Sequence, residues 1–83
     1  MSGAGVADDA AIWQAHEAAV KDIFSRLSKR LRGPEHPGMV APEFLAELSR
    51  LEIATADRLG RPREELAERF APDEAKLKSK CGF

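Results

Sequence analysis

The chain has 83 residues, of which 33% are charged and 6% are aromatic, and its formal net charge at pH 7 is −1. This balance excludes the large excess of Lys and Arg by which many proteins bind nucleic acids through bulk charge. A domain of this size buries only about 60% of the surface that its unfolded chain exposes, so we expect a second copy or another protein to complete the core.

The cysteine content and the lack of long apolar runs indicate the compartment. One cysteine, Cys81, excludes a disulfide within the chain and favours a reducing environment. The first residues lack the basic and apolar regions of a signal peptide, and no apolar run approaches the roughly 20 residues that cross a bilayer. We therefore expect a cytoplasmic protein that does not interact with membranes, and the abundance of Ala, Arg, Leu and Glu suggests a bacterial source.

A stripe of apolar residues predicts a long first helix over residues 8–32. Steps of seven, four, three and four residues place the stripe on one helix face, which must be buried. Asp8 is suited to cap the start of this helix, and we expect residues 1–7 to be disordered. The stripe consists of Trp13, Val20, Phe24, Leu27 and Leu31.

Two prolines and two glycines within residues 33–38 predict a loop after the first helix. Pro42 suits the first position of a second helix and Gly60 suits its end, so we expect this helix over residues 42–59. Its main apolar stripe contains Phe44, Leu48, Leu51 and Leu59, with Leu45 beside it. A second and shallower apolar face contains Ala46, Ile53 and Ala56, and we expect this face to bind another protein.

A short third helix is predicted over residues 62–70, with Pro62 at its start and Leu66 and Phe70 on its buried edge. Pro72 predicts the end of this helix, so we expect residues 72–83 to form a tail. The fold class is therefore all-α. We expect a helical hairpin or three-helix bundle in a single domain over residues 8–71, assembled into oligomers.

The sequence offers little for catalysis or metal binding. His16, His36 and Cys81 are too few, and too irregularly spaced, for a zinc site, so we expect no metal, no cofactor and no catalytic residue. His16 lies at the edge of the first stripe and should be partly buried with one ring nitrogen hydrogen-bonded, whereas His36 should be a solvated loop residue. Lys78 and Lys80 favour the Cys81 thiolate, but a mobile chain end offers it no general base.

Cations gather at the end of the first helix and could attract phosphates or an acidic protein. The alternative is that helix C-termini favour cations in any case, and that Asp22 pairs with Arg26 one turn later. This basic patch consists of Arg26, Lys29, Arg30 and Arg32.

Residues 53–70 follow the spacing of two short helices joined by a glycine turn, with the matching positions Ala56, Gly60 and Leu66. This stretch resembles the helix-turn-helix of bacterial regulators. The resemblance implies sequence-specific DNA binding, as a dimer, with Arg61 and Arg63 as DNA contacts.

The stretch also departs from that pattern. Arg61 stands where an apolar turn residue is usual, and Arg69 stands where the second helix normally buries an aliphatic side chain. The helix that would face the phosphates carries three acidic residues, which are Glu64, Glu65 and Glu68. The simpler interpretation is that Gly60 and Pro62 only join two helices.

These patterns predict a small, non-enzymatic bacterial regulatory or accessory protein, either an inhibitor, an adaptor or a small subunit. It would bind another protein, or a second copy of itself, through the second face of helix two, with the basic patch as the rim. The alternative is a DNA-binding regulator that uses residues 53–70.

Overall fold

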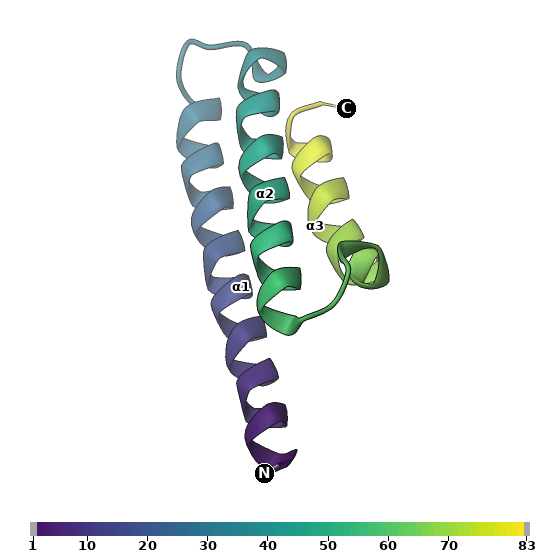
Figure 1. The fold of residues 1–83 in the computed structure, drawn as a ribbon. Helices are drawn as coiled ribbons and strands as arrows, with labels where there is room; N and C mark the ends of the chain where they lie inside the picture. Colours follow the sequence, from purple (N-terminus) through teal and green to yellow (C-terminus); the bar gives the residue numbers. More distant parts are fainter. Residues whose placement is uncertain (1, 83) are drawn as a thin grey trace.

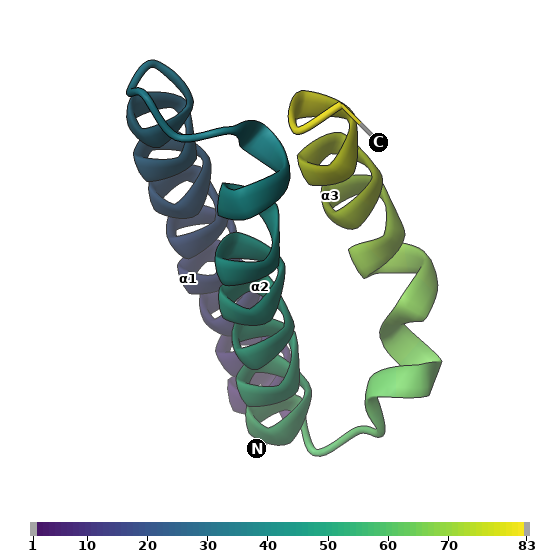
Figure 2. The same ribbon diagram turned by 90° about the horizontal axis from the view of Figure 1, so that it is seen from above.

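The computed structural model describes residues 2–82, with side chains from residue 9 onward. Three α-helices and one short 3-10 helix follow one another: α1 (Ser2–Leu31), α2 (Pro37–Leu59), η1 (Arg63–Leu66) and α3 (Ala67–Lys80). Between residues 2 and 82 there is no β-strand, and the predicted all-α class is confirmed. Helix α2 lies between α1 and α3 and runs antiparallel to both of them (Figures 1 and 2). None of the helices in this range combines the length and apolar content needed to cross a bilayer.

Helix α1 begins at Ser2, six residues before the predicted start, and ends at Leu31. The side chains of residues 1–8 lie outside the described part of the structure. Asp8 itself lies inside α1, six residues after the first residue of the helix, so it is not the N-cap that was expected. The disorder expected for residues 1–7 stays a prediction. The loop between α1 and α2 is short and spans residues 32–36.

Helix α2 begins at Pro37, not at Pro42 as predicted. His36 is its N-cap, because the His36 Nδ1 accepts a hydrogen bond from the Gly38 backbone N–H at 2.9 Å. Pro37 follows at a position where a helix needs no N–H donor, which explains why the helix starts there. His36 is therefore a capping residue and not merely a solvated one. The predicted end is confirmed, since Gly60 has a φ of 68°.

The C-terminal segment is helical, contrary to the predicted tail. Helix α3 continues through Pro72 to Lys80. Proline removes one backbone donor early in this helix, but the burial of Leu77 and Cys81, which are 0% and 6% exposed, holds the following turns against the bundle. Phe70, Leu77 and Cys81 are seven and four residues apart, which places them on one face of α3.

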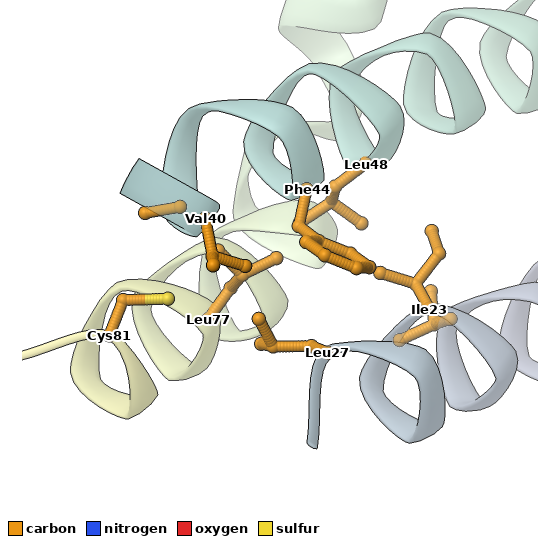
Figure 3. Close-up of a cluster of buried hydrophobic side chains, with 9 residues drawn as sticks. Ile23, Leu27, Val40, Phe44, Leu48, Leu77 and Cys81 are labelled. Carbon is orange, nitrogen blue, oxygen red and sulfur yellow. The ribbon is translucent and has the colours of Figure 1, made fainter. Parts of the chain in front are cut away.

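The core consists of two clusters along the bundle. The smaller cluster contains Ala56, Leu66 and Phe70, with Trp13 and Leu59 packed against it. The larger cluster brings together all three helices near the α1–α2 loop, as seven labelled side chains show in Figure 3. Its buried members are Val20, Ile23, Leu27, Val40, Ala41, Phe44, Leu48, Leu77 and Cys81. Both predicted stripes therefore supply the core, although Ile23 was missing from the first one.

Candidate protein-binding surface

Two large apolar side chains are exposed within residues 9–82. Met39 is 76% exposed in the first turn of α2, and Ile53 is 54% exposed four turns later. Ile53 borders a shallow hollow of about 540 Å³ on the surface of the bundle. Its lining is formed by Arg50, Ile53, Ala54, Ala56, Asp57, Arg61 and Arg63, and we call it the Ile53 hollow.

The predicted interface residues on α2 do not all lie on the surface. Ala46 and Ile53 are exposed, whereas Ala56 is only 3% exposed and packs with Leu66 and Phe70. Ala56 is therefore a core residue, because η1 and α3 cover this part of α2. Ala54, beside Ile53, is the exposed small residue of the hollow.

The hollow has an excess of positive charge. Arg50 and Arg61 are exposed and, among the side chains of residues 9–82, no carboxylate forms an ion pair with either of them. Asp57 is the one acidic residue of the lining. Two guanidinium groups are thus free to pair with carboxylates of another molecule.

The third arginine of the hollow is held by a buried carboxylate. Arg63 Nη2 donates to Glu52 Oε1 at 2.7 Å and lies 3.5 Å from Glu74 Oε2. Glu52 is 1% exposed, and within the described residues no group donates to its Oε2. Burial is the main cause that raises the pKa of Glu52 to about 7; the neighbouring Glu74 raises it as well, while Arg63 lowers it.

The predicted basic patch is largely neutralised. Arg26 pairs with Asp22 at 2.9 Å, as the alternative interpretation expected, and also with Glu47 on α2. Arg30 pairs in the same way, at 2.8 Å each, with Glu35 and Glu43. Through these ion pairs, Arg26 and Arg30 connect α1 to the loop and to α2. Lys29 and Arg32 remain exposed, but the patch is not the rim of the Ile53 hollow.

The segment that resembles a helix-turn-helix has a different geometry. Residues 63–66 form η1, and α3 then runs alongside α2 in the opposite direction (Figure 1). Of the two residues expected to contact DNA, Arg61 is exposed, whereas Arg63 is bound to Glu52. The acidic side chains that follow, Glu64, Glu65 and Glu68, are all exposed.

A second hollow, of about 490 Å³, lies between α1 and α3. The Arg69 Cζ atom lies 4.0 Å from the centroid of the Trp13 ring, and the Lys76 Nζ atom lies 5.1 Å from the centroid of the Phe24 ring. Cations of the chain itself therefore already cover one face of each ring. Its lining contains Trp13, His16, Glu17, Val20, Lys21, Phe24, Arg69, Asp73 and Lys76. Side chains of α1 and α3 meet across this hollow, and the centroids of the Trp13 and Phe70 rings lie 6.0 Å apart.

His16 lines this hollow from α1 and is buried. It is 4% exposed, and its Nδ1 lies 2.7 Å from the Thr55 hydroxyl, which confirms the expected hydrogen bond. Burial lowers its pKa, which favours the neutral imidazole. The ring also lies 5.3 Å from that of Phe70, so it links all three helices.

Cys81 differs from its predicted state. The thiol is buried, and burial raises its pKa, whereas Lys78 and Lys80 were expected to lower it. Within the described residues, no group of three or more His, Cys, Asp or Glu side chains is arranged to hold a metal ion.

The Ile53 hollow is distinguished from the surrounding surface by an exposed isoleucine, two unpaired arginines and a third arginine held by a buried carboxylate. Comparisons of the chain with protein-family models, with curated proteins and with solved structures find no match.

Proposed function

We propose that the chain is a non-enzymatic regulatory or accessory protein that binds another protein through the Ile53 hollow. The observation that carries this proposal is the 54% exposure of Ile53 at a hollow that Arg50, Arg61 and Arg63 also line. Protein interfaces typically combine an apolar centre with a polar rim, and arginine is enriched among the residues that contribute most to binding. An inhibitor, an adaptor or a small subunit would each act in this way.

The charge of the hollow favours an acidic partner. Arg50 and Arg61 lack carboxylate partners within residues 9–82, so a partner with carboxylates around an apolar side chain would complement both. A second copy would instead place two sets of arginines opposite each other, with only one Asp57 from each copy to balance them. We therefore propose a different protein as the partner.

The same region is less suited to DNA. Glu64, Glu65 and Glu68 are exposed on η1 and α3, next to the arginines that would have to contact phosphates. Carboxylates at these positions would repel the DNA backbone and offset the attraction by Arg61. The DNA-binding alternative therefore ranks below protein binding.

A comparison of two surface variants tests the proposal. Ile53→Asp should remove binding, because a charge would replace the apolar centre. Met39→Asp introduces the same charge at the other strongly exposed apolar residue, outside the hollow, and should leave binding intact. Both variants and the wild type would be used for affinity co-purification from lysate of the source cells, followed by mass spectrometry.

The expected result is an acidic protein that the wild type and Met39→Asp retain and that Ile53→Asp loses. Circular dichroism should show the same helicity in all three, because substitutions of exposed residues usually change stability by less than about 0.5 kcal/mol. Equal retention by Ile53→Asp, or equal loss in both variants, would place the binding surface elsewhere.

A further inference from the structure

Arg63 belongs to two environments. Its side chain is 43% exposed and lines the Ile53 hollow, yet the same guanidinium donates to the buried Glu52. A partner carboxylate that binds Nη2 of Arg63 from the hollow would compete with Glu52 for this donor. Arg50 and Arg61 have no such internal competitor within the described residues.

Glu52 lies beside a cavity of about 140 Å³ between α2, η1 and α3. The charged groups that line this cavity with it are Arg63 from η1 and Glu74 and Lys78 from α3. Its Oε2 has no donor among the described residues, so the carboxylate depends on Arg63 for its one close hydrogen bond.

We propose that an acidic partner in the Ile53 hollow draws Arg63 away from Glu52, and that Glu52 takes up a proton from solvent in the same event. This inference rests on the proposed function and adds a pH dependence to it. A buried carboxylate that loses its cation is strongly disfavoured, whereas the neutral acid can donate a hydrogen bond to the adjacent Glu74. Partner binding and protonation of Glu52 therefore favour each other.

Near neutral pH, protonation of Glu52 in exchange for its contact with Arg63 requires little free energy. Because the pKa of Glu52 is already raised to about 7, about half of the free chains carry the proton at that pH. Binding should tighten as the pH falls from 8 to 6. If binding raises the pKa from about 7 to about 8, the dissociation constant should be about fivefold lower at pH 6 than at pH 8.

The test uses a defined probe, an acetylated and amidated peptide of sequence Glu-Glu-Leu-Glu-Glu. Its affinity for the full chain is measured by calorimetry at pH 6 and pH 8, in two buffers that differ in ionisation enthalpy and thus report proton uptake. The wild type should bind more tightly at pH 6 and take up protons. Glu52→Gln should bind equally at both pH values and take up none.

Glu64→Gln is the matched control, because it makes the same substitution at an exposed position of η1 and should behave as the wild type. If Glu52→Gln does not fold, a ¹³C NMR titration of the Glu52 carboxyl in the wild type replaces it. The pKa of that carboxyl should then rise on addition of peptide.

The possible results distinguish a failure of the proposed coupling to Glu52 from a failure of the Ile53 hollow as the binding site. Equal affinity at both pH values, together with loss of binding in Ile53→Asp, would overturn the coupling and leave the proposed function intact. Peptide that binds Ile53→Asp as well as the wild type would contradict the hollow as the site. Absence of binding at both pH values would overturn the inference, because the hollow would not recognise acidic chemistry.

Discussion

Two buried titratable residues respond to pH in opposite directions. The folded chain lowers the pKa of His16 and therefore favours its neutral form, which stabilises the fold as the pH rises towards 6.5. It raises the pKa of Glu52 and therefore favours the neutral acid, which stabilises the fold as the pH falls. The two effects overlap below pH 6.5, so each must be measured by comparison with a variant that lacks the group.

Glu52 should make the chain less stable at alkaline pH. Its contribution is fully present below pH 4.5 and is lost as the pH rises through about 7, because the unfolded chain releases this proton more readily. A change in pKa of this size corresponds to about 3 kcal/mol. Urea unfolding from pH 4.5 to 8.5 should show that Glu52→Gln gains stability relative to the wild type by about this amount, since His16 is common to both.

A constant difference between the two proteins over this pH range would show that Glu52 has an ordinary pKa. Glu64→Gln is again the control, and its difference from the wild type should not change with pH. The same experiment requires no binding partner, so it tests the buried carboxylate independently of the proposed function.

Single residues differ in how much of their role the sequence reveals. The hydrogen bond of His16 could be predicted because the residue lies beside an apolar stripe, where an imidazole needs a partner. Glu52 lies four residues after Leu48 and four before Ala56, which is a buried spacing that could have identified it. Glu52 was not included in the buried face, because a glutamate is rarely buried unless it has a partner, and the sequence does not show the partner.

At the level of the elements, α3 shows why a proline is weak evidence for a helix end. Pro72 predicted a break, but the spacing of Phe70, Leu77 and Cys81 indicates a continuous buried face. The start of α2 also shows that a proline alone does not determine a helix end, since Pro37 and Pro42 were both possible first residues. Pro37 begins the helix because His36 precedes it and caps it, whereas Pro42 has no such residue before it.

The C-terminal half of α3 should therefore contribute substantially to stability. Leu77 is 0% exposed, so Leu77→Ala should lower the free energy of unfolding by about 2–5 kcal/mol. Lys80→Ala, at an exposed position of the same helix, should change it by less than about 0.5 kcal/mol. Guanidinium denaturation followed by circular dichroism measures both, and equal midpoints for Leu77→Ala and the wild type would contradict the docking of α3.

At the scale of the whole molecule, the periodic stripes predicted the helical class and half of the buried core residues, because burial of apolar faces determines both. The distribution of charges could not be predicted in the same way. Arg26 and Arg30 are paired with acids on α2 and in the loop, and these pairs form only when the bundle has folded. The result is that Arg26 and Arg30 are no longer available at the end of α1, where Lys29 and Arg32 stay exposed, whereas Arg50 and Arg61 stay unpaired beside Ile53.

Within residues 9–82, the Ile53 hollow combines an exposed apolar side chain with two unpaired arginines, and it is therefore the central element of the proposed function. The oligomers expected from the small size of the chain stay a prediction. An acidic partner on the hollow would provide the additional buried surface that a chain of this size benefits from.

Site-specific photo-crosslinking in the source cells tests this claim most directly. A photoreactive amino acid would replace Ile53 in one version of the chain and Met39 in another, since both side chains are exposed and only the first lies in the hollow. We predict a covalent adduct with one acidic protein from position 53, absent from position 39 and lost when Arg50→Glu and Arg61→Glu are combined. Adducts that are equal from both positions, or that survive the two charge reversals, would contradict the assignment of the Ile53 hollow as the binding surface.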